Sequence, residues 1–395
     1  MDASTLRLGF LIGVIGLISV LLWRDRENVE RKGILFFRRT QRGIDLIDRI
    51  AKKTPKFWNV YAWTGVVAAF ASMILITVVL GRGILDTVLS GVPSESFGLV
   101  APGTGSSVST QPGVTFVPAE YWFISIAVIM VVHELSHGII ARLEDFEINS
   151  VGVLVLGIIP GAFVEPKGEN MLPNGDDDQE ENENEDGGEG MAAPWDQGDW
   201  KSRLKVLSAG SFANYVTAFI FLAAFFGASN LMASPGEVNY QAQASFPAAE
   251  AGMNQGRLLA FNGSEIDNIT EFTRSADSIK ANETYNLVTS EGEFNVTATS
   301  REGVEGDSGY IGVRFSPFTP LENWFASLLQ IIAVLNLGIG MFNMLPAKPL
   351  DGGHIIDTVV ERFIGDEGRR YVNIWSLAVI LILAGVLVYS IFGPF

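Results

Sequence analysis

Cysteine is absent from this chain of 395 residues, and histidine occurs only three times. The absence of cysteine excludes disulfide bonds and thiolate metal sites, so a transition-metal site would need His, Asp or Glu ligands. Basic residues are also scarce, because 27 Lys and Arg stand against 44 Asp and Glu and give a formal net charge of −17. So acidic a chain argues against nucleic acid as a partner. It suits a cytoplasm of high salt, where screening removes the self-repulsion of the surface.

Long apolar runs, in contrast, are abundant. Hydrophobic residues make up 48% of the chain, and several runs approach or exceed the roughly 18 residues that can cross a bilayer as a helix. The predicted class is therefore a polytopic α-helical membrane protein. We expect about six transmembrane helices, at residues 6–23, 57–80, 121–142, 204–232, 321–345 and 371–392.

The basic residues between these runs predict how the chain crosses the membrane. Residues 24–56 are rich in Arg and Lys, so the positive-inside rule places this loop in the cytoplasm and the N-terminus outside. Six spans then put both termini outside. The Gly-, Ser-, Thr- and Pro-rich residues 81–118 also lie outside, and residues 346–370 return to the cytoplasm. The first span lacks the basic start and cleavage site of a signal peptide, which favours a retained helix.

Three segments do not have the pattern of a transmembrane helix. Residues 151–164 are apolar but broken by glycines and a proline, which favours a re-entrant hairpin or short strands packed against helices. Residues 174–190 are acidic and low in complexity, as is typical of a disordered, solvated loop. Residues 234–317 are polar, and β-prone runs separated by turn residues predict a small soluble domain there. Four Asn-x-Ser/Thr sequons fall in it, which agrees with its external location: Asn262, Asn268, Asn282 and Asn295.

The motif His133-Glu134-Leu135-Ser136-His137 lies inside the third apolar run. Residues four apart share one face of a helix, so both imidazoles can bind one Zn²⁺ while Glu134 reaches the water that the ion activates. Ionisable residues are costly in hydrocarbon and usually mark a functional site. The alternative is a polar patch in which the two histidines serve packing or helix–helix hydrogen bonds.

Catalytic zinc typically takes three protein ligands and keeps one position open for water. Our candidate for the third ligand is Asp351, which follows Pro346 and Pro349. The prolines would end the fifth helix, and Gly352 and Gly353 permit a tight turn. The third and fifth spans run in the same direction, so Asp351 and the two histidines would share the cytoplasmic side. The alternative role for Asp351 is the N-cap of the next helix.

Other residues compete for roles at this site. His354 is a fallback ligand. Glu165 is the only apolar-flanked carboxylate alternative, and a different membrane zincin, such as a prenyl-protein processing protease, would require such a glutamate. Asn343 either hydrogen-bonds a substrate backbone or satisfies backbone groups freed by Pro346. In a zinc peptidase, Glu134 would take the proton of the water and later donate it to the leaving amine.

Together these residues resemble the site-2 protease family of intramembrane zinc metalloproteases. The match rests on His133-Glu134-x-x-His137 and on the segment from Asn343 to Gly352, which is similar to the family motif Asn-x-x-Pro…Leu-Asp-Gly. The apolar run 204–232 lies between them, and the resemblance covers residues 121–392. It implies one zinc ion per chain. The implied ligands are His133, His137 and Asp351, and the implied catalytic base is Glu134.

Further segments resemble other parts of the family. Residues 151–165 resemble its membrane-embedded β-hairpin. Residues 209–214, Ala-Gly-Ser-Phe-Ala-Asn, resemble a Gly-Pro-x-x-Asn motif with Ser211 in place of the proline. With Asn343, Asn214 is a candidate for substrate binding. Residues 246–263 resemble the start of the PDZ domains that many of these proteases carry, and PDZ domains bind extended peptides by strand addition.

The resemblance implies a protein of the cell membrane that cuts transmembrane segments of regulatory proteins, often after a first cut by another protease. Its partners would be transmembrane substrates, the lipid bilayer and a peptide ligand of the PDZ-like domain, in a halophilic archaeal source. That domain would lie outside and the active site toward the cytoplasm. The alternative is a catalytically silent membrane scaffold, against which the intact Glu134 and complete ligand set argue. The expected divisions are residues 1–80, 81–118, 119–233, 234–318 (PDZ-like) and 319–395.

Overall fold

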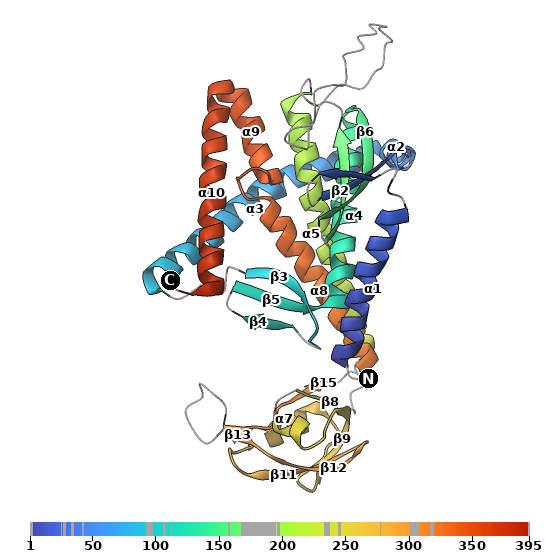
Figure 1. The fold of residues 1–395 in the computed structure, drawn as a ribbon, viewed down its shortest axis with the longest axis vertical. Helices are drawn as coiled ribbons and strands as arrows, with labels where there is room; N and C mark the ends of the chain where they lie inside the picture. Colours follow the sequence, from blue (N-terminus) through green and yellow to red (C-terminus); the bar gives the residue numbers. More distant parts are fainter. Residues whose placement is uncertain are drawn as a thin grey trace. The chain divides into compact units, whose positions relative to one another are not determined.

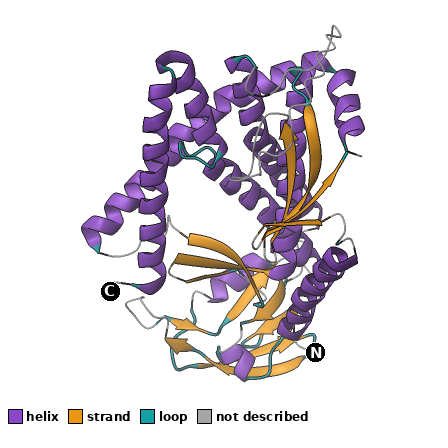
Figure 2. Cartoon of the chain, turned by 45° about the horizontal axis from the view of Figure 1, so that its top comes forward, coloured by secondary structure: helices purple, strands orange, loops and turns teal. Residues whose placement is uncertain are grey.

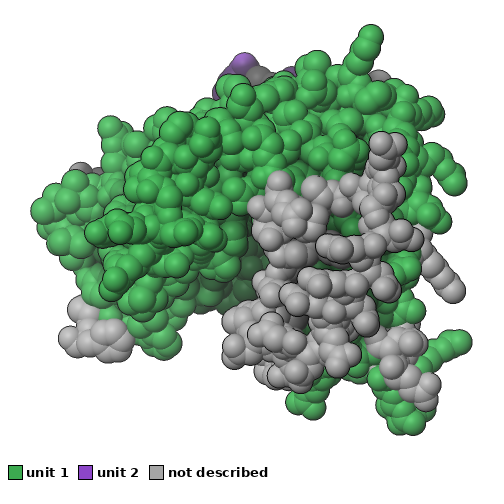
Figure 3. Space-filling view, turned by 90° about the horizontal axis from the view of Figure 1, so that it is seen from above, with its two compact units in different colours: residues 1–220, 331–395 green, residues 221–330 purple. Residues whose placement is uncertain are grey.

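The computed structural model describes residues 3–24, 26, 29–32, 35–41, 43–91, 98–105, 108–111, 113–156, 159–166, 195, 198–232, 238–243, 246–276, 278–300, 308–316 and 320–393. The chain forms two compact units. Unit 1 comprises Met1–Ile220 and Ile331–Phe395, and unit 2 comprises Phe221–Gln330. Figure 3 shows unit 1 as one continuous body although it is built from two parts of the sequence. The acidic segment 174–190, expected as a disordered loop, lies outside the described residues.

Unit 1 consists mainly of helices (Figures 1 and 2). Five helices in the described part of the chain are long and apolar enough to cross a membrane. They are α3 (Pro55–Ser90), α4 (Ala119–Leu143), α5 (Trp200–Met232), α8 (Pro320–Asn343) and α10 (Asp366–Phe392). They match the second to sixth expected spans. A helix also forms at the first, α1 (Ala3–Arg24). The shorter helices are α2 (Ile44–Lys53) and α9 (Asp351–Ile364).

The connection from α8 to α9 positions the expected third ligand. The helix α8 ends at Asn343, three residues before Pro346, as the sequence predicts. The helix α9 begins at Asp351, so this residue lies in the first turn and is not the N-cap. Gly352 and Gly353 are helical and do not form the expected turn. A Cβ on either would lie 2.4 Å or less from backbone atoms of the preceding loop, so the two glycines allow α9 to start directly against that loop.

A four-stranded antiparallel sheet packs beside α4 (Figure 1). Its strands β6 (Ile148–Leu156) and β7 (Ile159–Pro166) form the hairpin that the sequence predicts. The strands β1 (Val29–Lys32) and β2 (Leu35–Thr40) extend it in the order β1-β2-β6-β7, and the sequence analysis missed them. The glycine break in β6 has a packing reason, because a Cβ on Gly152 would lie 2.3 Å from the carbonyl oxygen of β2 residue Arg38.

The segment expected as an external loop also forms a sheet. Its strands are β3 (Gly98–Gly103), β4 (Ser109–Gln111) and β5 (Gly113–Pro118), with β3 and β5 parallel. The chain adopts φ +74° at Gly113, where a Cβ would lie 2.7 Å from the side chain of Ile391. The glycine therefore allows β5 to pack closely against the end of α10.

Unit 2 is rich in strands, as the β-prone runs within residues 234–317 predict. Its main sheet has the order β12-β11-β9-β8-β15, with β10 paired to β9. The strands are β8 (Val238–Ala242), β9 (Gln255–Phe261), β10 (Ser264–Glu265), β11 (Thr284–Thr289), β12 (Gly292–Thr297) and β15 (Val313–Ser316), with the minor pair β13 (Thr299–Ser300) and β14 (Gly309–Tyr310). Unit 2 also contains two short helices, α6 (Pro247–Glu250) and α7 (Ile269–Ala276), and the parts of α5 and α8 at residues 221–232 and 320–330. The hydrophobic core includes Val238, Leu258, Leu287 and Val296.

Candidate metal centre

Two imidazoles lie one turn apart on α4. The Nε2 atoms of His133 and His137 are 3.1 Å apart. The two side chains share a helix face because their positions differ by four residues. His133 is 6% exposed, so the pair lies inside the protein.

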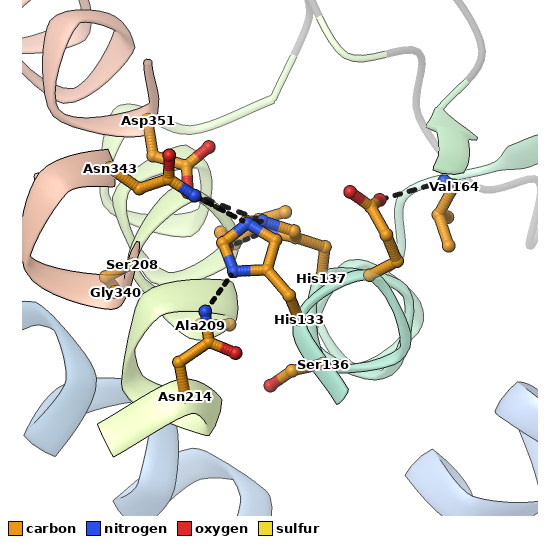
Figure 4. Close-up of polar contacts among 12 residues, drawn as sticks. His133, Ser136, His137, Val164, Ser208, Ala209, Asn214, Gly340, Asn343 and Asp351 are labelled. Carbon is orange, nitrogen blue, oxygen red and sulfur yellow. Dashed lines mark hydrogen bonds and ion pairs between the residues drawn. The ribbon is translucent and has the colours of Figure 1, made fainter. Parts of the chain in front are cut away.

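The carboxylate of Asp351 reaches the same point from α9. Its Oδ2 lies 3.3 Å from Nε2 of His133 and 3.6 Å from Nε2 of His137. The three ligand atoms all lie within 4.8 Å of one another. Residues more than 200 positions apart in the sequence therefore converge, and Figure 4 shows Asp351 and His133 facing each other across the site.

Two observations indicate that this group fits a metal ion. The Oδ2 atom of Asp351 is buried without a hydrogen-bond partner among the described residues, which is costly unless another group binds it. A Cβ built on Gly210 of α5 would lie 2.3 Å from Nε2 of His137 and 2.8 Å from Nε2 of His133. The absence of a side chain at Gly210 thus leaves space beside both imidazole nitrogens.

Two residues of α5 contact the Nδ1 atoms of the two imidazoles. The Nδ1 atom of His137 is 2.7 Å from the carbonyl oxygen of Val206, to which it can only donate. That tautomer leaves Nε2 with a free lone pair for a metal. The Nδ1 atom of His133 is 3.1 Å from the carboxamide of Asn214 (Figure 4). Asn214 is fully buried. Sequence reasoning missed Val206, because a backbone carbonyl acts through its position and leaves no signal in the sequence.

Glu134 contacts the hairpin. Its Oε2 accepts a hydrogen bond from the backbone N–H of Val164 in β7, at 3.1 Å. The predicted hairpin is thus joined to the helix turn that carries both histidines. Val164 makes this contact through its backbone N–H. The residue type therefore gives no signal from which the contact could be predicted.

Asn343, the last residue of α8, directs its amide toward the site. Its Nδ2 is 3.4 Å from Nε2 of His133 (Figure 4). The sequence left a second role open, in which this amide satisfies backbone freed by Pro346. The carbonyl concerned, that of Phe342, already accepts a hydrogen bond from the N–H of Leu345 at 3.0 Å. The position of Asn343 therefore favours a role at the site.

The two alternative ligands lie outside the group of three. His354 is on α9 but is not among the residues whose ligand atoms converge. Glu165 accepts hydrogen bonds from Ser150, at 2.7 Å, and from Arg39, at 3.2 Å. Its carboxylate is therefore used within the four-stranded sheet.

The loop before Asp351 is tied to α9 and α10. The Nζ of Lys348 lies 2.8 Å from the carboxylate of Asp357, and its backbone N–H donates to Ser376 at 3.0 Å. The indole of Trp375 donates to the carbonyl of Pro346 at 2.9 Å. These contacts, which the sequence analysis did not anticipate, fix the loop that delivers the carboxylate.

Comparison with known proteins agrees with this arrangement. Residues 121–386 match the model of peptidase family M50. The chain is 26% identical to a protein of Methanocaldococcus jannaschii named "Uncharacterized protein", over 95% of this chain and 98% of that one. Shorter segments are similar to bacterial proteins named "Putative zinc metalloprotease". Identity is 33% over 84 residues in Brucella suis (21% of this chain, 22% of the relative) and 32% over 74 residues in Mesorhizobium japonicum (18% and 20%).

Proposed function

Because the chain belongs to peptidase family M50, the site-2 protease family, we propose that it is an intramembrane zinc endopeptidase. Its substrates would be transmembrane segments of membrane-bound regulatory proteins, cleaved in or near the bilayer. The observation that carries the proposal is the convergence of His133, His137 and Asp351 within 4.8 Å. The long apolar helices around this group support a site at membrane depth.

The proposed ligands of a single zinc ion are these two imidazoles and one carboxylate, a donor set found in catalytic zinc sites with one position left for water. When bound, the ion would supply Lewis acidity, which activates water and polarises the scissile carbonyl. The carbonyl of Val206 supports the proposal because it accepts from Nδ1–H of His137 and leaves Nε2 of that ring for the metal. The carboxamide of Asn214 lies at Nδ1 of His133, with Nδ2 at 3.1 Å. Turned so that Oδ1, which has no partner among the described residues, accepts from Nδ1–H, it would leave Nε2 of His133 for the metal in the same way.

Glu134 is the proposed general base. Its carboxylate would take a proton from the attacking water and return it to the leaving amine. The hydrogen bond from Val164 keeps the carboxylate beside β7. For Asn343 we propose contact with the substrate at the rim of the site. For Asn214, full burial behind His133 favours orientation of that ring over the expected contact with substrate.

For topology, we propose six spans that include α1, with both termini outside and the metal site toward the cytoplasm. The basic residues between α1 and α3 support this orientation. We also propose that residues 234–318 form an external PDZ-like domain that binds an extended peptide. Its sheet and its resemblance to the start of a PDZ domain support this assignment.

The test is cleavage of a model transmembrane substrate by detergent-purified full-length protein in high salt, with metal content measured on the same samples. We expect Glu134→Gln to lose activity by about 10²- to 10⁴-fold while retaining about one zinc per chain. Asp351→Ala should lose both zinc and cleavage. Glu165→Gln is the matched control because its carboxylate contacts Ser150 and Arg39, and it should keep both. Zinc-loaded wild type that cleaves no membrane segment would favour the scaffold alternative, and full zinc in Asp351→Ala would exclude Asp351 as a ligand.

A further inference from the structure

Tyr61 lies on α3, outside the residues that match the family model, yet its hydroxyl contacts α4 and α5, two of the helices at the metal centre. The oxygen is 3.0 Å from Oγ of Ser136 on α4 and 3.5 Å from the carbonyl oxygen of Ala209 on α5. One proton arrangement satisfies both contacts: Ser136 donates to Tyr61, and Tyr61 donates to Ala209. The phenol therefore bridges α4 and α5.

The two partners of Tyr61 are immediate neighbours of groups at the metal centre. Ser136 precedes His137, and Ala209 precedes Gly210, whose backbone faces both imidazoles. A change in the separation of α4 and α5 at this level would move His137 relative to the α5 backbone. Ligand distances at metal sites vary by only about 0.2 Å, so a small displacement would be felt by the metal.

The ring of Tyr61 is itself held in place. Its centroid lies 4.7 Å from that of Phe212 and 5.3 Å from that of Trp58. One turn further along α3, a Cβ on Gly65 would lie 3.3 Å from the side chain of Phe212, which shows how closely α3 and α5 pack. This packing of the ring fixes the position of the Tyr61 hydroxyl.

The segment before α3 contacts the same part of α4 at two further points. A Cβ on Gly138 would lie 2.9 Å from the side chain of Ile47 in α2. The guanidinium of Arg142 donates to both carboxylate oxygens of Asp48, at 2.5 and 3.1 Å. With Ser136, these contacts fall in the turns of α4 that include and follow His137.

We propose that Tyr61 is a positioning residue for the metal centre and that α2 and α3 are part of the scaffold that sets its geometry. This inference rests on the metal site proposed above. The hydroxyl holds α4 and α5 at the separation at which His137, His133 and the backbone of Gly210 would line the metal site. Tyr61 would act through its contacts with Ser136 and Ala209.

The experiment is a titration of metal-stripped, detergent-purified full-length protein with Co²⁺, read by the visible absorption of the bound ion. Tyr61→Phe removes the hydroxyl and keeps the ring against Phe212. We expect Co²⁺ to bind about tenfold more weakly, with a changed spectrum, because partners beyond the ligands typically contribute 10- to 100-fold to metal affinity. A merely structural role would lower the melting temperature and leave the affinity and spectrum of the folded protein unchanged.

The matched control is Thr64→Val on the same helix. Its hydroxyl donates within α3, to the carbonyl of Val60 at 2.8 Å, so wild-type affinity is expected. Ser136→Ala removes the Tyr61 contact from the α4 side and carries the test if Tyr61→Phe does not fold. The two substitutions combined should weaken binding no more than Tyr61→Phe alone, because Tyr61→Phe already removes the contact with Ser136.

Two results would overturn the inference, and they are distinguishable. Wild-type affinity and spectrum in both Tyr61→Phe and Ser136→Ala would refute the positioning role and leave the proposed function intact. Failure of the wild-type protein to bind Co²⁺ would refute the proposed metal site and this inference with it.

Discussion

The two units of this protein differ in how completely they bury polar side chains. The core of unit 2 is conventional, with apolar side chains such as Val238, Leu287 and Val296 at 0% exposure. Unit 1 is surrounded by apolar helices, yet it also buries side chains that hydrocarbon disfavours, and Ser125, Ser211, Asn214 and Asn336 are all fully buried. Buried polar groups are costly unless they are bonded. One of these residues, Asn214, contacts His133, so part of the cost of burying polar groups in unit 1 is connected with the site.

The largest loss of metal binding is expected from a substitution at Gly210 in unit 1, which lies beside both imidazoles. In Gly210→Ala the new methyl group would lie 2.3 Å from Nε2 of His137, in the space proposed for the ion. We expect metal binding to be lost, measured as zinc per chain after purification. The control is Gly338→Ala on α8, where no described atom lies within 4 Å of an added Cβ. Full zinc in Gly210→Ala would contradict the assignment of this space to the metal.

An equally severe change in unit 2 should leave the metal centre intact. Leu287→Ala empties a fully buried position in β11, and large-to-small changes of this kind cost about 3 kcal/mol. We expect a lower unfolding temperature for unit 2, followed by proteolysis of residues 238–316, with unchanged zinc content. Leu259→Ala in β9 is the control because that side chain is 41% exposed. Loss of zinc in Leu287→Ala would show that the two units depend on one another.

Two fully buried asparagines of unit 1 allow a finer comparison. Asn214 contacts Nδ1 of His133, whereas the amide of Asn336 donates to the carbonyl of Ile332 within its own helix. We expect Asn214→Leu to weaken zinc binding by about 10- to 100-fold, as for other partners of metal-bound histidines. Asn214→Asp should restore much of it, because a carboxylate accepts from Nδ1–H. A chelator competition assay measures both. An equal loss in Asn336→Leu would mean that burial of an amide, and not contact with His133, is what matters.

The parts of the site that the sequence predicts are those carried by side-chain chemistry. The helical spacing of His133 and His137 and the prolines before Asp351 were sufficient to expect the group of three, because residue type and local geometry determine what these residues can bind. The contacts that α5 makes with the metal site could not be predicted from side-chain chemistry. Val206 acts through a carbonyl, and Gly210 acts by having no side chain, so both depend on how two helices pack.

The same distinction applies to the fold. Helix length and the β6–β7 hairpin follow from local patterns, namely apolar runs and glycine breaks. The strands β1 and β2 could not be expected from residues 24–56, because their basic side chains suggest a solvated loop. The strand β2 pairs with β6 across more than 100 residues, and β1 pairs with β2. Such long-range pairing is set by tertiary contacts. The role of Tyr61 was hidden for a similar reason, since its partners lie on helices distant in the sequence.

The smallest effect is expected where α2 meets the end of α4, away from the buried polar centre. The hydrogen bond from Arg142 lowers the pKa of Asp48 below its ordinary value of 3.8. A lowered pKa means that the pair stabilises the fold at pH values above 3.8, and that this contribution is lost as the pH falls through the folded-state pKa. Both side chains are partly exposed, so the contribution should be about 1 kcal/mol or less.

Asp48→Asn should therefore melt at a slightly lower temperature than wild type at neutral pH, and the melting temperatures of the two proteins should converge in acid. Asp45→Asn, on the exposed face of α2, should follow wild type throughout. A difference between Asp48→Asn and wild type that persists once Asp48 is protonated in the folded protein would mean that packing of α2 against α4, and not the ion pair, accounts for the stabilisation.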